Sequence, residues 1–339
     1  MKKVICALLA MLMAFSLCAC GAAPAASTPA STAASAAPAS TPATDGTFTI
    51  GWSVYNAAYE FFIDMQNGVV DKCKELGIEV LTHDQKGDET EMITGCQNLI
   101  AQGIDALVIS PCKPEAMNTI VELAHEKKIP VIIVDIGDGD SDKDAIIISD
   151  VFGGGQIAGK YALDLIKEKG LTSKNAAIIK CEASAVYAIR RGEGFKDIVT
   201  KAGMTVVKEI TANSEQDEGY TAMQDILATY AEDLSVVFCE NDNMALGAAQ
   251  AVDEAGLTGK ILVIGFNADA TAVEAIKDGI MQGTIAQQPH EMGAMGAELA
   301  NTLLTGGTIT YDDDTTKEIY ADVYLVDATG EKNDSYKAG

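Results

Sequence analysis

The chain has 339 residues, and its 24 basic and 49 acidic side chains give a formal net charge of −25 at pH 7. This charge argues against a nucleic-acid-binding protein, because such proteins need basic surfaces that neutralise phosphates. We expect the charge to aid solubility through self-repulsion. Hydrophobic residues make up 48% of the chain, which supplies a large core, and the length suffices for two domains.

The first residues have the pattern of a targeting segment. Two lysines are followed by an apolar run over residues 4–17, which is too short to span a bilayer comfortably as a mature helix. The sequence LCAC at residues 17–20 is similar to the bacterial lipobox. This similarity implies cleavage before Cys20 and attachment of diacylglycerol to its sulfur, so we predict a lipoprotein signal peptide over residues 1–19. The alternative is an ordinary secretory signal with incidental cysteines.

Residues 20–46 are almost entirely small residues and proline, with almost no charge and no periodicity. Such a segment cannot bury enough apolar surface to offset its chain entropy, and its prolines favour extended conformations. We therefore predict a disordered tether that begins at the lipidated Cys20. Because two acyl chains on one cysteine suffice for stable anchoring, the protein is expected on the extracytoplasmic face of the cell membrane.

Short apolar runs alternate with helical patterns along the rest of the chain. The predicted strands cover residues 47–54, 78–83, 105–110, 130–135, 145–149, 176–180, 204–210, 235–239, 260–266 and 283–287. Wholly apolar strands separated by helices indicate parallel sheets covered on both faces. Ten strands are many for one such sheet. The predicted class is therefore α/β, with two Rossmann-like lobes and a break near residues 149–150.

A glycine-rich segment, GGGQIAG at residues 153–159, fits the dinucleotide-binding pattern and follows a predicted strand. A single match is a weak signal, and no acidic residue suited to a ribose ends the next predicted strand. We interpret the glycines as allowing close helix packing, and we expect no cofactor. Asp150, just before them, leaves two interpretations open: a helix cap or a ligand contact.

Cysteine and histidine spacing predicts neither a disulfide framework nor a metal site. The five cysteines after Cys20 are odd in number and contain no CxxC pair; they are Cys73, Cys96, Cys112, Cys181 and Cys239. The three histidines fit no ligand spacing. No nucleophile with a neighbouring base is visible, so we do not expect an enzyme.

The residues that follow the predicted strands are rich in carboxylates, amides and aromatic rings. Ligands of parallel sheets bind outside the carboxyl ends of the strands. The positions concerned are residues 53–62, 110–111, 135, 149–150, 181–182, 240–242, 266–267 and 287. These side chains offer hydrogen bonds and ring faces, as a polyhydroxylated ligand requires.

Several stretches resemble the ribose-binding-protein family, the solute-binding components of bacterial sugar ABC importers. The stretches are residues 61–68, 99–111, 129–135, 190–195 (RRGEGF), 240–248 (ENDNMALGA), 263–267 and 283–289 (GTIAQQP). The resemblance runs from about Thr47 to Val326. It implies the type I periplasmic-binding-protein fold, in which a three-segment hinge joins two lobes. We expect an N-terminal lobe of residues 47–148 plus 288–321 and a C-terminal lobe of residues 149–287 plus 322–339.

The resemblance also implies which residues bind the ligand. Phe61 and Phe62 would sandwich a sugar ring, and Asp135, Arg191, Asn241 and Gln287 would form hydrogen bonds with its hydroxyl groups. We expect the neighbouring Asp242 to cap a helix instead.

The chain departs from the family at several of these positions. Ile136 replaces an arginine, and Asn267 replaces an aspartate. The loop at residues 57–60 differs, so Trp52 and Tyr55 are expected to add ring faces. Glu182 stands where the family has an apolar contact.

The resemblance implies a monomeric, lipid-anchored binder that delivers a sugar or sugar-like polyol to an ABC permease. One alternative is a sensor of the same fold that reports to a chemoreceptor or membrane kinase. Another is a binder of a nucleoside or a signal molecule. A lactose-repressor-type regulator shares the fold, but the lipobox and the absence of an N-terminal helix-turn-helix argue against it.

Overall fold

A computed structural model describes residues 47–183 and 185–339 of the chain. The predicted signal peptide, the tether and Cys20 lie outside these residues. Within the described residues, none of the helices combines the length and the apolar character that crossing a membrane requires.

The first sheet is wholly parallel, with the strand order β11-β5-β4-β3-β1-β2. Its strands are β1 (Thr49–Val54), β2 (Glu79–Asp84), β3 (Ala106–Ile109), β4 (Val131–Val134), β5 (Ala145–Ser149) and β11 (Glu318–Ala321). The central strands β3, β4 and β5 are buried along their whole length. This burial explains why they consist of apolar, mostly β-branched residues without alternation.

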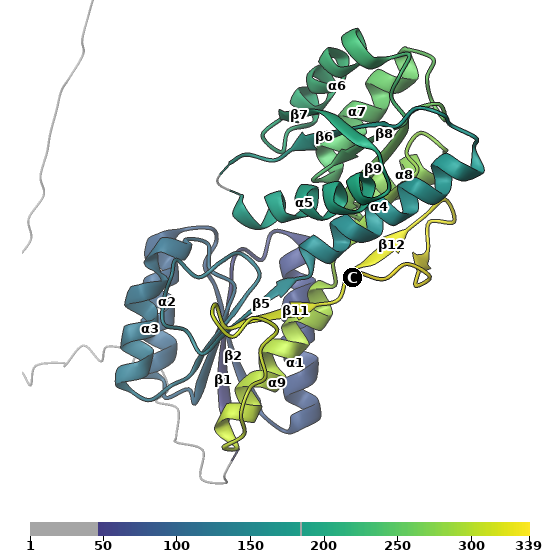
Figure 1. Cartoon of the computed structure of the whole chain (residues 1–339). Helices are drawn as coiled ribbons and strands as arrows, with labels where there is room; N and C mark the ends of the chain where they lie inside the picture. Colours follow the sequence, from purple (N-terminus) through teal and green to yellow (C-terminus); the bar gives the residue numbers. More distant parts are fainter. Residues whose placement is uncertain (1–46, 184) are drawn as a thin grey trace, which may run out of the picture. The chain divides into compact units, whose positions relative to one another are not determined.

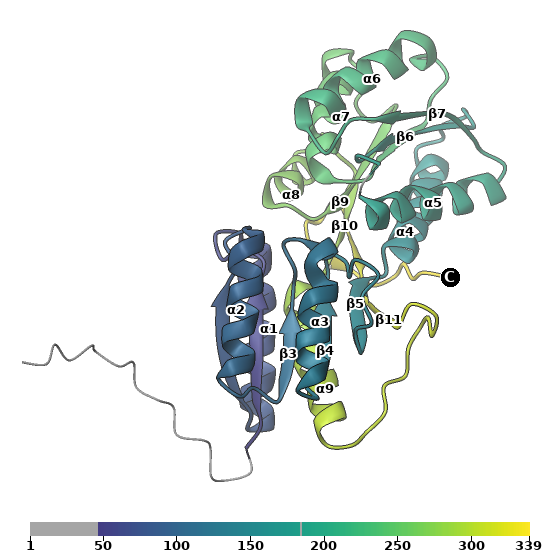
Figure 2. The ribbon, with the colours of Figure 1, turned by 90° about the vertical axis from the view of Figure 1, so that its left-hand side faces the viewer.

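Helices cover both faces of the first sheet (Figures 1 and 2). They are α1 (Glu60–Leu76) and α9 (Pro289–Leu304) on one face, and α2 (Glu89–Ala101) and α3 (Met117–Glu126), preceded by the 3₁₀ turn η1 (Pro114–Ala116), on the other. Successive strand residues point to opposite faces. Val108 therefore packs with α1 and α9, whereas Leu107 and Ile109 pack with α2 and α3.

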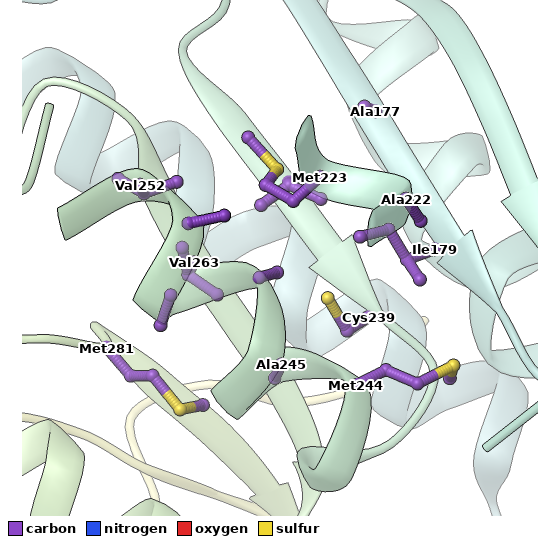
Figure 3. Packing of buried hydrophobic residues seen from close by; sticks show 14 of the residues in the cluster. Ala177, Ile179, Ala222, Met223, Cys239, Met244, Ala245, Val252, Val263 and Met281 are labelled. Carbon is purple, nitrogen blue, oxygen red and sulfur yellow. The ribbon is translucent and has the colours of Figure 1, made fainter. Parts of the chain in front are cut away.

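The second sheet has the order β13-β12-β10-β9-β8-β6-β7, in which only β12 pairs antiparallel, with β10 and β13. Its strands are β6 (Asn175–Lys180), β7 (Thr205–Thr211), β8 (Val236–Cys239), β9 (Leu262–Asn267), β10 (Gly283–Ala286), β12 (Tyr324–Val326) and β13 (Lys332–Asn333). The helices α4 (Val151–Glu168) and α5 (Val186–Lys201) cover one face, and α6 (Gln216–Tyr230), α7 (Asp242–Glu254) and α8 (Ala270–Lys277) cover the other. Figure 3 shows the core between this sheet and the helices α6, α7 and α8, in which Met223, Cys239 and Val263 are fully buried.

The chain passes from one sheet to the other after β5, after β10 and after β11. The prediction of an α/β fold with two Rossmann-like lobes is confirmed, and each of the predicted strands corresponds to one of β1 to β10. The sequence patterns missed β11, β12 and β13. The cysteines among the described residues are all free.

The glycine-rich segment at residues 153–159 lies in α4, where that helix packs against α5. A Cβ atom added at Gly155 would lie 2.0 Å from the carbonyl oxygen of Arg191, and one at Gly194 would lie 2.0 Å from that of Phe152. The two backbones are therefore too close for side chains at these positions. The Asp150 carboxylate caps α4 by accepting a hydrogen bond from the amide of Gly153 at 2.8 Å.

Candidate ligand-binding site

A cavity of about 460 Å³ lies at the carboxyl ends of strands from both sheets. Its walls come from η1, from the end of β5, from the segments after β4, β5, β6 and β10, and from the first turns of α5. The lining residues are Pro114, Glu115, Asp135, Ile136, Ile148, Ser149, Val151, Glu182, Ala185, Tyr187, Ala188, Arg191 and Gln287. The structure thus brings together four residues predicted to bind ligand: Asp135, Glu182, Arg191 and Gln287. The volume suits a small molecule of monosaccharide size.

Contacts within the protein hold Arg191 in place. Its guanidinium lies over the ring of Phe266, 4.1 Å from the ring centroid. Its Nη1 donates to the carbonyl oxygen of Glu240 at 2.7 Å and to Oδ1 of Asn267 at 3.3 Å. The Nε–H is buried and has no hydrogen-bond partner among the described residues. No described residue accepts a hydrogen bond from Nη2, so this group is the one suited to donate to a ligand in the cavity.

Asp135 follows β4 and supplies the acidic counterpart. Its φ of 76° lies in the left-handed region, and its amide donates to the carbonyl oxygen of Ile147 at 2.8 Å. No described residue donates a hydrogen bond to its carboxylate. Burial raises the pKa of Asp135 to about 6, although the positive charge of Arg191 opposes this shift. The carboxyl group of Asp135 thus lines the cavity without a hydrogen-bond donor from the described residues.

A chain of hydrogen bonds links the first sheet to Arg191. The Ser149 hydroxyl, at the end of β5, donates to Oε1 of Gln287 at 2.9 Å. The Nε2 of Gln287 donates to Oδ1 of Asn267 at 3.0 Å, and Asn267 in turn accepts from Arg191. Two of the segments that join the sheets thereby help to fix the guanidinium.

Asn241 and Asp242 differ from the prediction. Asn241, not Asp242, caps α7, because its Oδ1 accepts from the amide of Met244 at 3.0 Å. The Asp242 carboxylate is fully buried and accepts from Thr284 Oγ1 at 2.7 Å and from the amide of Asp269 at 2.8 Å. Asn241 is not among the residues that line the cavity.

The predicted aromatic residues lie on the first lobe, outside the cavity lining. Phe62 is 8% exposed and stacks on Tyr55 with ring centroids 4.7 Å apart. Phe61 is half-buried and meets Phe62 edge-on at 5.2 Å. Trp52 requires a correction, because it is completely buried in the core. In β1 it shares the face of Ile50 and Val54, which packs against the helices rather than toward a ligand.

Tyr187 is a cavity residue that the sequence patterns missed. It lies one helical turn before Arg191 on α5, and residues four apart share a helix face. This spacing is the signal that identifies it. The neighbouring Arg190 is not among the lining residues, and its guanidinium lies 4.9 Å from the centre of the Tyr187 ring.

The sequence matches known proteins over most of its length. The family described as "Periplasmic binding protein domain" matches residues 50–308. The ribose import binding protein of Bacillus subtilis is 33% identical over 261 residues, which cover 76% of this chain and 82% of that protein.

Two similar solved structures are ABC transporter solute-binding proteins. Each is 26% identical to this chain and matches 84% of it. The first is from Actinobacillus succinogenes with bound D-allose; the match covers 99% of that protein, with a TM-score of 0.67. The second is from Bacillus halodurans with bound myo-inositol; the match covers 96% of that protein, with a TM-score of 0.65.

Proposed function

The chain belongs to the ribose-binding-protein family of periplasmic binding proteins, and on this premise we propose that it captures one sugar or sugar-like polyol between its two lobes and delivers it to an ABC permease. Its fold is the two-lobe α/β fold of type I periplasmic binding proteins. Relatives of known ligand bind ribose, D-allose or myo-inositol. All three of these ligands are rich in hydroxyl groups.

The arrangement of Arg191 and Asp135 is the observation that carries this proposal. The guanidinium and the carboxyl group line one cavity. Among the described residues, no hydrogen bond engages Nη2 of Arg191 or the carboxyl group of Asp135. Hydrogen bonds between hydroxyl groups and charged side chains contribute about 1.5–3 kcal/mol each. In this proposal Glu182 and Gln287 add further contacts from the cavity wall, and Phe61 covers the apolar face of the ring when the lobes close.

We place the lobe boundaries at the three passages between the sheets. The N-terminal lobe then comprises residues 47–148 and 288–321, and the C-terminal lobe comprises residues 149–287 and 322–339. Rotation about these passages would enclose the ligand. Capture is coupled to closure only when the ligand binds the closed state more tightly, since equal affinity for both states shifts no equilibrium.

A thermal-shift screen of the full chain in detergent tests the binding function. The library comprises pentoses, hexoses, acyclic polyols and cyclitols, and calorimetry follows for each hit. A ligand at about one hundred times its dissociation constant stabilises the folded state by about 2.7 kcal/mol. We expect at least one member to raise the melting temperature. If amino acids or nucleosides bind and no sugar or polyol does, the proposal is wrong.

The membrane anchor is part of the same proposal and has its own test. The lipobox-like sequence at residues 17–20 is the basis for placing a diacylglycerol on Cys20. Cys20→Ala should release the protein from membranes or leave it unprocessed. Cell fractionation with labelled fatty acid measures this, and a variant that still carries label in the membrane fraction contradicts the anchor.

A further inference from the structure

The cavity holds more acidic than basic side chains. Its described lining includes Glu115, Asp135 and Glu182, but Arg191 is the only basic side chain in it. Glu115 is exposed and forms an ion pair with Lys113 at 3.6 Å, so water and Lys113 compensate its charge. Asp135 and Glu182 remain to be balanced by one guanidinium.

Glu182 is fixed in position with one oxygen unused. Its Oε2 accepts from the Ser214 hydroxyl at 2.6 Å, whereas no described residue donates to its Oε1. The nearest lysine in the sequence, Lys180, is paired with Glu209 at 3.4 Å instead. A second lysine, Lys196, also binds Glu209, at 2.7 Å. The basic residues on neighbouring elements therefore leave the Glu182 charge uncompensated.

Arg191 cannot balance both carboxylates. Its Nη1 is already engaged with the Glu240 carbonyl oxygen and Asn267. Its charge also acts on the buried carboxyl groups of Glu240 and Asp242 below the cavity. The Nη1 group of Arg191 is therefore committed to the protein, and no hydrogen bond or ion pair joins Arg191 to Glu182 among the described residues. One guanidinium carries a single positive charge against the two carboxylates.

Closure of the lobes would make this imbalance more costly. Burying a carboxylate without a compensating charge is strongly unfavourable. A neutral polyol supplies hydroxyl donors to a carboxylate but no positive charge. An ammonium group supplies both, and its three N–H donors match the free oxygen of Glu182.

Resting on the proposed capture of a sugar-like molecule, we propose that the ligand carries a protonated amine, as in an amino sugar or an aminocyclitol. The ammonium binds the free oxygen of Glu182, which Ser214 positions. The hydroxyl groups donate to Asp135 and accept from Nη2 of Arg191, which no described residue engages. The net charge of −25 on the chain adds a long-range attraction for such a cation.

Calorimetry of the full chain with matched ligand pairs near neutral pH tests this inference. The pairs are D-glucosamine with D-glucose, D-allosamine with D-allose, and scyllo-inosamine with scyllo-inositol. N-Acetyl-D-glucosamine retains the nitrogen without its charge. In at least one pair the amine should bind at least about tenfold more tightly, a difference of about 1.4 kcal/mol. The acetylated sugar should lose this advantage.

Two variants with the same change of charge locate the effect. Glu182→Gln should reduce the preference for the amine at least about tenfold. Glu193→Gln is the matched control, because Glu193 is an exposed residue of α5 outside the cavity lining. It should leave the preference unchanged.

The outcomes separate this inference from the proposed function. If the neutral sugars bind as tightly as their amines, the ammonium site is wrong and sugar capture stands. The site is also wrong if Glu182→Gln retains the preference. If no member of any pair binds and the wider screen finds no sugar or polyol, both proposals fail.

Discussion

Asp135 and Arg191 should be the residues whose loss weakens ligand binding most. Each supplies charge-assisted hydrogen bonds that no described residue already uses. Losing one such bond costs about 1.5–3 kcal/mol, so Asp135→Ala and Arg191→Ala should each weaken binding at least about tenfold. Titration calorimetry with a ligand from the screen measures this.

Asp150→Ala is the matched control for these two variants. Asp150 caps α4 and does not line the cavity. Its loss should cost about 1 kcal/mol of stability and change affinity less than the other two variants do. Wild-type affinity in both Asp135→Ala and Arg191→Ala would mean that the ligand binds elsewhere.

Two buried carboxyl groups should make stability fall as pH rises from about 4.5 to 7. Burial raises the pKa of both Glu240 and Asp242 to about 7. The folded state then retains protons that the unfolded chain releases near pH 4, so rising pH favours unfolding. Each group contributes a slope of at most about 1.4 kcal/mol per pH unit.

Urea denaturation at several pH values measures this slope. Glu240→Gln has no titratable group at position 240, so its free energy of unfolding should fall less steeply over the same pH range. Glu193→Gln is the exposed control. Burial raises the pKa of Asp135 to about 6, which acts in the same direction. Parallel curves for the wild type and Glu240→Gln would contradict the assignment of this effect to Glu240.

At the scale of elements, the contact between α4 and α5 should be intolerant of side chains. A methyl group at Gly155 would collide with the Arg191 backbone, so the two helices would have to separate. Overpacking of this kind costs about 1–3 kcal/mol. Gly155→Ala should therefore lower stability, and ligand affinity with it, because Arg191 would shift from the Glu240 carbonyl group.

Chemical denaturation and calorimetry measure both effects. Lys167→Ala, an exposed substitution near the end of the same helix, should change stability by no more than about 0.5 kcal/mol. A Gly155→Ala variant as stable as this control would show that the two helices can separate at no cost.

The elements with strong apolar patterns were predictable, and the irregular ones were not. β1 to β10 are short apolar or β-branched runs bounded by turns. In contrast, β11 has the sequence EIYA and β13 only KN. These strands depend on their neighbours in the sheet rather than on a pattern of their own.

The candidate site shows the same limit of prediction. Asp135 and Gln287 follow directly from their places after strands. The burial of Trp52, however, depends on which face of β1 packs against the helices. Whether Asn241 or Asp242 caps α7 depends on a shift of one residue in the start of the helix. Single-residue register of this kind is set by tertiary packing, which no local pattern records.

At the scale of the whole molecule, an ion pair connects elements of the two lobes. Arg190 on α5 donates to both carboxylate oxygens of Glu318 on β11, with Nη1–Oε2 and Nη2–Oε1 distances of 3.0 and 3.3 Å. The Tyr320 hydroxyl also donates to Glu318, at 3.0 Å. Glu318 is almost completely buried, whereas Arg190 is partly exposed.

Arg190→Ala should lower the free energy of unfolding by about 1–3 kcal/mol, because it leaves a buried carboxylate short of donors. Glu318→Gln should cost less, and a double-mutant cycle should give a favourable coupling between the two residues. Chemical denaturation measures all three variants. A coupling of zero would mean that the pair adds nothing to the connection between the lobes.

The strand order also determines when each lobe can be completed during synthesis. The first sheet acquires its edge strand β11, and the helix α9 that covers one of its faces, only after the central strands of the second sheet have been made. Until then Val108, Val134 and Ile147 have no α9 to pack against. The N-terminal lobe therefore cannot be completed first, as the N-terminal domain of a nascent chain usually is. The second sheet also gains its last strands, β12 and β13, after β11, so neither lobe is complete until the C-terminal segment has been made.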